Sequence, residues 1–254
     1  MEVSELSTLG LLGYSVFSGN REFFADGVSG VINTINPHSY VLARKDGQFR
    51  DALIAADVLI PDGVGIKVAA RILKGRNIDR ITGSDLHEII LKALDQRQGS
   101  CFYLGSSAET LGKLEERLKH EHPFLRTGYY SPPFSAEFSE AESNEMIESV
   151  NNFAPDVLFV GMTAPKQEKW VHKHRDRLQV PLICSIGAVF DFYSGTVKRS
   201  GDMWINMGLE WLPRLLREPG RLWKRNFVST PLFLWYVAVE KIKLGNNLNS
   251  RLTK

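Results

Sequence analysis

The sequence predicts an α/β fold, a Rossmann-like and mostly parallel sheet flanked by helices, with a basic helical C-terminal appendage. Short runs of β-branched and aromatic residues alternate with longer segments of helical periodicity, as they do where crossover helices join parallel strands. Glycine or a small polar residue follows nearly every short run. Near Lys198 the composition becomes basic and rich in tryptophan. We therefore divide the 254 residues into an α/β domain, residues 1–197, and the appendage, residues 198–254.

Strands are expected at six of the short runs: Val31–Asn33, Val58–Ile60, Cys101–Leu104, Thr127–Tyr130, Val157–Val160 and Leu182–Ile186. The N-terminal run Leu11–Phe17 is a seventh candidate. The segments between the strands carry helix signals. These signals are an apolar stripe from Leu86 to Leu94 with Ser84 as N-cap, leucines 111, 114 and 118 after Ser106 and Ser107, a capping box at Ser139 and Glu142, and Pro165 in the first turn of a helix that runs to about Leu178.

Composition narrows the classes of protein that fit. The net charge of +2 argues against a nucleic-acid partner. Cys101 and Cys184 lie in apolar runs and are expected to be buried and reduced, because two such residues make no disulfide framework. The acidic N-terminus shows no secretory signal. The longest apolar stretch, Pro231–Val239, is shorter than the about 20 residues that span a bilayer, so we expect any membrane contact to be peripheral.

Ligands of open parallel sheets bind beyond the carboxyl ends of the strands, so the residues that follow the strands are the site candidates. Asp62 follows Val58–Ile60 in a loop with two glycines, where a carboxylate can act as a general base. It could equally cap a helix over Val64–Leu73. Gly63-Val64-Gly65 resembles the start of a dinucleotide fingerprint, but position 68 is valine and no acidic ribose-binding residue follows. This departure argues against a nucleotide-dependent oxidoreductase.

Three other polar residues near strand ends are candidates for ligand binding. Asn36, before Pro37, marks a turn or a helix start, and its amide could orient a sugar hydroxyl. Arg80 could bind a phosphate or form a surface salt bridge. Gln167 lies in the first turn of its helix and could hydrogen-bond a sugar or uracil. The sequence has no Asp-x-Asp motif, and its paired histidines are two residues apart, so they would face opposite sides of a helix. We therefore expect a site that needs no metal or other cofactor.

The appendage is more basic than the rest of the chain. Between Lys198 and Arg225 it has seven basic and three acidic residues. On a helix, five of the basic residues would fall within about 100° of arc; they are Arg214, Arg217, Arg221, Lys224 and Arg225. Pro213 and Pro219 make one uninterrupted helix unfavourable. A basic segment with tryptophans suits an anionic membrane surface, although the same arginines could clamp a diphosphate or form a solvated face.

Ordered motifs spread over residues 30–225 resemble the WecG/TagA/CpsF family of bacterial glycosyltransferases, glycosyltransferase family 26. The motifs are Asn36-Pro37, Ala56-Asp57 through Pro61-Asp62-Gly63, Arg80 to Leu86, Gly161 with Pro165-Lys166-Gln167-Glu168, Gly187 to Asp191 with Gly195 and Lys198-Arg199, and Gly208 to Leu212. The chain departs from the family at Ser200-Gly201, where Ala-Pro usually follows the Lys-Arg pair. It also has Pro213 in place of a common aromatic residue.

The resemblance implies an inverting transferase that moves a hexose or N-acetylhexosamine from a UDP-sugar onto an undecaprenyl-diphosphate-linked sugar. Such enzymes act at the cytoplasmic face of the inner membrane, in the synthesis of cell-surface polysaccharide or teichoic acid. By this resemblance Asp62 is the base, and Thr34 and Asn36 line its pocket. The implied donor-binding residues are Arg80, Gly161, Lys166, Gln167, Gly187 and Asp191, and the implied contacts to the acceptor diphosphate and membrane are Arg214, Arg217, Arg221 and Lys224. A non-catalytic membrane-surface binding protein is the alternative.

Overall fold

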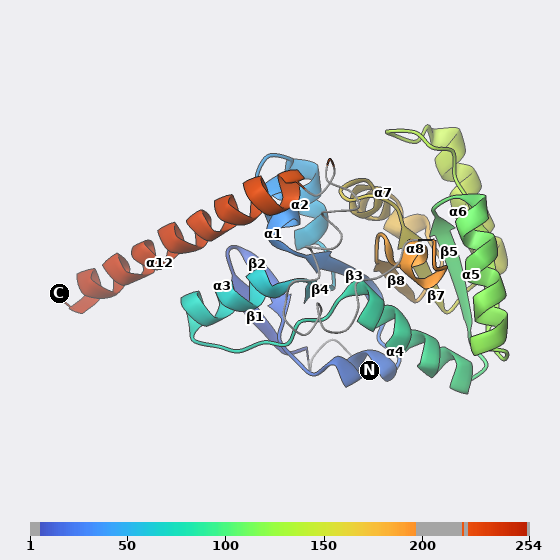
Figure 1. Ribbon diagram of the computed structural model, residues 1–254, viewed down its shortest axis with the longest axis horizontal. Coiled ribbons are helices and arrows are strands. Elements are labelled where there is room, and N and C mark those ends of the chain that lie inside the picture. Colours follow the sequence, from blue (N-terminus) through green and yellow to red (C-terminus); the bar gives the residue numbers. More distant parts are fainter. Residues whose placement is uncertain (1–5, 197–219, 221–222, 253–254) are drawn as a thin grey trace.

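A six-stranded parallel sheet forms the centre of the protein (Figure 1). The computed structural model describes residues 6–196, 220 and 223–252. The order of the strands is β4-β3-β8-β7-β5-β6. Each of the six expected runs forms one of these strands, which confirms the fold class; they are β3 (Gly30–Ile35), β4 (Val58–Pro61), β5 (Ser100–Gly105), β6 (Arg126–Tyr130), β7 (Val157–Gly161) and β8 (Leu182–Ser185). Most of their side chains are buried, as in other parallel sheets that are covered on both faces.

Helices cover both faces of the sheet. One face packs on α4 (Gly83–Gln96), α5 (Ala108–Glu121) and α8 (Val189–Tyr193) through a cluster that includes Ile32, Tyr103 and Phe159. The other face packs on α6 (Glu140–Phe153) and α7 (Lys166–His174) around Leu158 and Ile183. A third cluster joins β3 and β4 to the helices α1 (Pro37–Ala43), α2 (Gly47–Ile54) and α3 (Val64–Lys74).

The sequence predicts the run Leu11–Phe17 as a further strand of the sheet, but the run does not join the sheet. It belongs to an antiparallel hairpin of its own, in which β1 (Thr8–Leu11) pairs with β2 (Tyr14–Phe17). Leu12 and Gly13 form the two-residue turn and have φ angles of 54° and 88°. A two-residue hairpin turn of type I′ has positive φ at both central residues, and glycine supplies one of them at no steric cost. The 3₁₀ turn Arg21–Ala25 then leads to β3.

Most helix starts follow the expected signals. Ser107 caps α5, and Ser139 forms its capping box with Glu142 at the start of α6. The N-cap of α4 is Thr82 rather than Ser84, two residues later, because Thr82 and Asp85 form a reciprocal capping box. Helix α7 starts after Pro165 but ends at His174, and the 3₁₀ turn Arg175–Arg177 replaces its expected last turn. Cys101 and Cys184 are buried and free, as expected.

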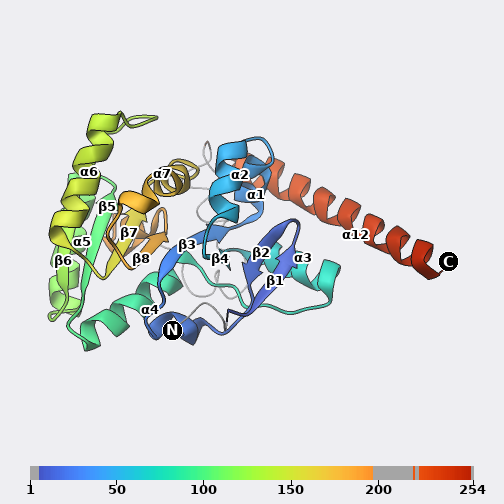
Figure 2. The same cartoon turned by 180° about the vertical axis from the view of Figure 1, so that it is seen from behind.

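The C-terminal helix α12 (Thr230–Leu252) extends away from the body of the protein (Figures 1 and 2). A π-helical turn, Lys224–Ser229, precedes it. Phe233 and Val237 are fully buried in the cluster formed with α1 and α3, so the start of α12 is anchored to the α/β domain. No helix in the described part of the chain is long and apolar enough to cross a membrane. The expected domain boundary at residue 197 lies outside the described residues and stays a prediction.

Candidate active site

The helices that follow two neighbouring strands lie on opposite faces of the sheet. After β3 it enters α1, whose Tyr40 and Val41 pack on the face of the sheet that also carries Ile35. After β8 it enters α8, whose Val189 and Phe190 join the cluster on the opposite face. Strands β3 and β8 are hydrogen-bonded neighbours. Helices that diverge in this way mark a topological switch point at the carboxyl ends of the two strands, where ligands of such sheets usually bind, and we call this place the β3–β8 crevice.

The residues expected to form the general base and its pocket lie beside this crevice. The backbone N–H of Asp62 donates to the Ile35 carbonyl at 2.8 Å, so the loops after β4 and β3 leave the sheet side by side. A Cβ atom placed on Gly63 would lie 3.9 Å from the Asn36 Cβ. Thr34 is half-buried in β3, and Asn36, two residues later, still has an extended backbone as the N-cap of α1, so the alternation of side chains puts both on the same side of the chain. Thr34, Asn36 and Asp62 are therefore grouped, as expected, although their roles stay predictions.

Asp62 lies directly before the start of α3. The N-cap of α3 is Gly63, with a φ of 93°, and Asp62 lies one residue before it. Asp62 is half-buried. Asp62 is therefore not the N-cap residue of α3, and its role as a base stays a prediction.

Asn36 has a structural role that sequence had suggested. Its Oδ1 accepts hydrogen bonds from the backbone N–H groups of His38 and Ser39, both at 3.0 Å, and so caps α1. The Ser39 hydroxyl in turn accepts from the Asn36 N–H at 2.8 Å. These bonds fix the amide of Asn36, and they leave its Nδ2 group as the part that can donate to a ligand.

Arg80 lies at the same edge of the sheet. The N–H of Ile81 donates to the Pro61 carbonyl at 3.1 Å, at the end of β4. A Cβ atom on Gly83 would lie 3.0 Å from the Ile186 carbonyl oxygen, at the end of β8. The segment 80–83 therefore runs between these two strand ends, and it brings the half-buried Arg80 to the carboxyl edge.

Gln167 joins the loops that follow β7 and β8. Its Oε1 accepts from the N–H groups of Met162 and Gly187, both at 3.1 Å. The side chain is 2 % exposed, and Gly187, with a φ of 60°, supplies the left-handed turn that presents its N–H to Gln167. Because the amide oxygen of Gln167 already accepts two hydrogen bonds within the protein, Gln167 would contribute to donor binding by holding the loops after β7 and β8 in place.

The glycines at the ends of β5 and β7 serve packing. A Cβ on Gly105 would clash with the backbone of Gly161, and a Cβ on Gly161 would lie 2.5 Å from the ring of Phe190. Gly161 therefore has no open side from which a ligand could approach its Cα. Glycine at these two positions allows the close packing of β5, β7 and α8, and the donor-binding role of Gly161 stays a prediction.

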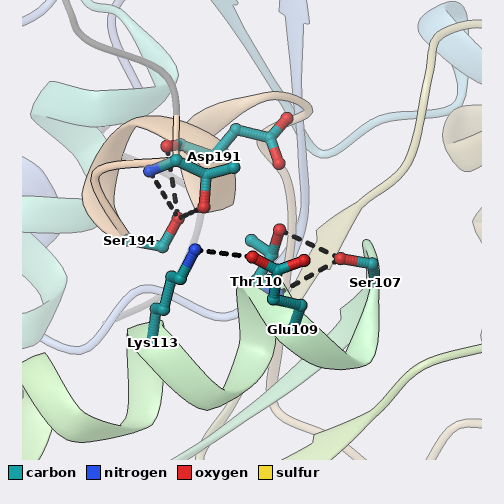
Figure 3. A network of polar contacts seen from close by, with 7 residues as sticks. Ser107, Glu109, Thr110, Lys113, Asp191 and Ser194 are labelled. Carbon is teal, nitrogen blue, oxygen red and sulfur yellow. Dashed lines mark hydrogen bonds and ion pairs between the residues drawn. The ribbon is translucent and has the colours of Figure 1, made fainter.

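Lys166 and Asp191 lie towards the β5–β6 side of the edge. The Nζ of Lys166 donates to the Ser135 carbonyl at 2.7 Å and lies 3.7 Å from the centre of the Phe138 ring. Burial lowers the pKa of this ammonium group. The Oδ1 of Asp191 accepts from the Ser106 hydroxyl at 3.3 Å. Figure 3 shows that the Asp191 carboxylate points away from the Glu109–Lys113 ion pair on α5.

Glu168 is a polar residue of the site region that belongs to the motif Pro165-Lys166-Gln167-Glu168 but has no role implied by it. It is 2 % exposed, and its Oε1 accepts from the Nε2 of Gln167 at 2.9 Å. Burial raises the pKa of its carboxyl group to about 7. An acidic residue in the first turn of a helix is usually exposed, so the sequence carried no signal of this burial.

Of the four residues assigned to the acceptor diphosphate and the membrane, only Lys224 is described. It is exposed on the π-helical turn before α12. Arg214, Arg217 and Arg221 lie outside the described residues. Ser229, in the same turn as Lys224, makes a hydrogen bond of 2.8 Å with the Nδ1 of His38. This contact joins the basic turn to the helix that Asn36 caps.

Within the described ranges, no group of three or more histidine, cysteine, aspartate or glutamate residues could hold a metal ion. The expectation that the reaction needs no metal stays a prediction.

Comparison with known proteins adds a family and named relatives. The profile of the family described as "Glycosyl transferase WecG/TagA/CpsF family" matches residues 16–247. A protein of Bacillus spizizenii is 30% identical over 80% of this chain and 76% of its own length, and one of Bacillus subtilis is 27% identical over 87% and 84%. A Staphylococcus aureus protein is 26% identical over 84% and 81%. All three are named N-acetylglucosaminyldiphosphoundecaprenol N-acetyl-beta-D-mannosaminyltransferase.

Proposed function

We propose, because the chain belongs to the WecG/TagA/CpsF family of glycosyl transferases, that it moves a hexose or N-acetylhexosamine from a UDP-sugar to an undecaprenyl-diphosphate-linked sugar, with inversion. The relatives' names make N-acetylmannosamine the first donor sugar to test and a lipid-linked N-acetylglucosamine the first acceptor. The observation that carries the proposal is the grouping of Asp62 with Asn36 and Thr34 beside the β3–β8 crevice.

In the proposed reaction the Asp62 carboxylate takes the proton of the acceptor hydroxyl. The oxygen freed of its proton forms a bond to the anomeric carbon of the donor sugar. The bond between that carbon and the diphosphate oxygen breaks on the opposite face, and the electron pair leaves with UDP. Inversion follows from this in-line geometry, and the proton stays on Asp62 until it passes to solvent.

The leaving diphosphate gains negative charge as its bond to the sugar breaks. Fixed N–H dipoles and cations stabilise such charge without reorganisation. In this chain the half-buried Arg80 comes to the carboxyl edge between β4 and β8, and Gln167 fixes the loops that carry Met162 and Gly187. We assign these loops and Arg80 to the donor side of the crevice.

A donor screen with Asp62→Asn tests the proposal. Purified protein is mixed with a lipid-diphosphate-linked N-acetylglucosamine and a panel of UDP-sugars, and released UDP is measured. The wild-type chain is expected to turn over one donor, and Asp62→Asn is expected to lose about 10²–10⁴-fold in kcat, the usual contribution of a general base. Asp26→Asn, at an exposed position on the opposite edge of the sheet, serves as the matched control.

Three outcomes decide between the candidates. Near-wild-type turnover by Asp62→Asn would remove Asp62 as the base. A protein that binds acceptor vesicles but releases no UDP with any donor would favour the non-catalytic binding protein. Loss of turnover with EDTA, and its return with a divalent cation, would contradict the metal-independent reaction.

The exposed side of α12 supports a membrane contact. Its buried side carries Phe233 and Val237, whereas large apolar side chains are exposed on the other side. At 100° per residue Leu234, Trp235 and Ile242 fall within about 100° of arc on one outward face of α12. Phe227 and Val228 are exposed in the π-helical turn that precedes it. The exposed Lys224 and Lys241 lie beside this face. Exposed apolar residues with tryptophan and flanking lysines are typical of helices that lie in a membrane interface.

Vesicle sedimentation tests this surface. We expect the double variant Trp235→Ser/Ile242→Ser to lose binding to vesicles that contain anionic phospholipid and to keep its turnover of a short-chain, water-soluble acceptor. Ile54→Ser, which removes an equally exposed isoleucine on α2, is the control. Unchanged vesicle binding by the double variant would exclude α12 as the membrane contact. A concentration-dependent mass that the double variant abolishes would assign the face to a second copy of the chain instead.

A further inference from the structure

Four buried side-chain atoms of the described residues have no hydrogen-bond partner. One is the Asn226 Nδ2 in the π-helical turn, and the other three, on fully buried side chains, are the Asn33 Oδ1, the Glu168 Oε2 and the Ser185 Oγ. The three side chains are 1 %, 2 % and 0 % exposed. Leaving a buried polar atom unpaired costs about 1–3 kcal/mol, so three of them in one region need a physical explanation.

The register of the sheet places Asn33 and Ser185 next to each other. Ile32 pairs with Cys184, so the following residues, Asn33 and Ser185, are neighbours on adjacent strands. Side chains alternate between the faces of a strand, which puts these two on the face of Val31 and Ile183. That face packs on Val171 of α7.

Helices α2 and α7 cover this position together. The Nδ2 of Asn33 donates to the Ala52 carbonyl of α2 at 3.2 Å. Glu168 lies one helical turn before Val171 and two turns before Arg175, which donates to the Ala55 carbonyl at the end of α2. The Glu168 side chain therefore lies on the face of α7 that is turned towards the sheet and α2, where Asn33 and Ser185 also lie.

The charged groups around Glu168 are engaged with other partners. Lys169 pairs with Asp46 of α2 at 3.1 Å, and Arg175 pairs with Asp57 at 3.1 Å. His174, whose pKa is lowered mainly by burial, packs against the Trp170 ring. The ion pairs found among the described residues include none with Glu168, and burial of its carboxyl favours the neutral form.

We propose that Glu168 is a positioning residue, held as a neutral carboxylic acid, whose Oε2 proton is shared with Asn33 and Ser185 through one buried water molecule. The chemistry of the three groups is complementary, since the acid donates, the amide oxygen accepts and the hydroxyl does either. A buried water typically makes about three hydrogen bonds to groups that otherwise lack a partner. The cluster accounts for these three unpaired atoms at once.

Through Gln167 this cluster reaches the donor side of the site. The Glu168 Oε1 accepts from the Gln167 Nε2, which orients the amide so that its Oε1 faces the Met162 and Gly187 N–H groups. Ionised Glu168 would be a buried charge with no ion-pair partner found among the described residues, and burying such a charge is costly. Loss of the proton is therefore expected to loosen the loops after β7 and β8. This step rests on the proposed function, because it gives those loops a part in donor binding.

Infrared spectroscopy tests the protonation state without a substrate. A protonated-carboxyl absorption is expected at pH 6, shifted by ¹³C-glutamate labelling and absent in Glu168→Gln. The control Glu148→Gln, at an exposed position on α6, should keep this band. Absence of the band from the wild-type protein at pH 6 would overturn the proposal, whatever the enzyme assay shows.

The pH profile of turnover tests the positioning role. For the wild-type chain, kcat/KM is expected to fall as the pH rises above about 7, with most of the change in the KM for the donor. Glu168→Gln, which keeps both a donor and an acceptor, should retain activity and lose this alkaline decline. Glu168→Ala is expected to lose about 10-fold in kcat/KM at every pH, as outer-shell partners of functional groups typically do. An alkaline decline that persists in Glu168→Gln would refute the positioning role, whereas a wild-type chain inactive with all donors would refute the proposed function alone.

Discussion

Gly65→Ala tests how closely the loop of Asp62 is packed on the helix that Asn36 caps. Gly65 lies in the first turn of α3, three residues after Asp62. A Cβ atom at this position would overlap the Cγ of Pro37 and lie 3.4 Å from its Cδ and 3.6 Å from the Cε1 of Phe233. Pro37 follows Asn36, and its ring cannot rotate away. The added methyl group must therefore move α3, α1 or α12.

The expected cost is set by two opposing terms. Overpacking of a tightly packed site costs about 1–3 kcal/mol. Replacing glycine with alanine in a helix gives back about 0.5–1 kcal/mol, because it restricts the unfolded chain. We therefore expect Gly65→Ala to be less stable than the wild type by roughly 1–2 kcal/mol. Gly112→Ala is the matched control, since Gly112 is exposed in α5 with open space around it, and it should stabilise by about 0.5–1 kcal/mol.

Urea unfolding followed by circular dichroism gives both free energies of unfolding. The steric term is the difference between the two variants, in which the helix propensity largely cancels. Turnover measured below the unfolding transition should fall for Gly65→Ala, because a displaced α3 moves Asp62 relative to Asn36. If both variants were equally stabilised and equally active, the close packing of α3 on the Asn36-Pro37 turn would be wrong.

Three further predictions follow from buried polar groups. Burial raises the folded-state pKa of Glu168 from 4.5 to about 7, so this group lowers the free energy of unfolding as the pH rises from about 4.5 to 7. In urea titrations, the free energy of unfolding of Glu168→Gln relative to the wild type should therefore increase by at most about 3 kcal/mol between pH 4.5 and pH 8. Burial lowers the pKa of His87 to about 3, so the stability that the neutral imidazole contributes is lost as the pH falls from 6.5 towards 3. The free energy of unfolding of His87→Gln should therefore fall less over this range than that of the wild type, by up to about 5 kcal/mol. An unchanged dependence of this free energy on pH would contradict the burial of His87. Ser229→Ala leaves the buried side of His38 without its partner and should cost about 1–2 kcal/mol, with an increase in hydrogen exchange at the start of α12 as the local readout.

The sequence was sufficient for the sheet because each strand is a short apolar run followed by a glycine or a small polar residue. It was insufficient where one residue changes the direction of the chain. Leu12 takes a positive φ that leucine rarely adopts, and only Gly13 beside it signalled the hairpin. The apolar pattern predicts the start of α4 two residues late, although Thr82 and Asp85 have the spacing of a capping box. Both errors concern local signals that were present but outweighed by the apolar pattern.

The site was predicted in part for the same reason. Asp62, Asn36 and Thr34 follow or end neighbouring strands, and parallel pairing brings such residues together without further information. The role of Gln167 could not be predicted, because its bonds to Met162 and Gly187 depend on how two loops distant in sequence lie beside each other. The burial of Glu168 depends on the packing of α7 on α2, and no sequence period reports the contact of two helices that are more than 100 residues apart.

The arrangement of the described residues suggests which side of the crevice each substrate of the proposed reaction occupies. Asp62 and Asn36 lie on the β3–β4 side of the crevice, and the contact between His38 and Ser229 brings the π-helical turn that carries Lys224 to the same side. A lipid-linked acceptor held at α12 would therefore reach Asp62 first, while the loops tied by Gln167 are left for the nucleotide donor. Gly187→Ala strains a left-handed turn on the donor side, so it should raise the KM for the UDP-sugar and leave the KM for the acceptor within twofold. An equal rise in both constants would show that the two substrates do not divide the crevice in this way.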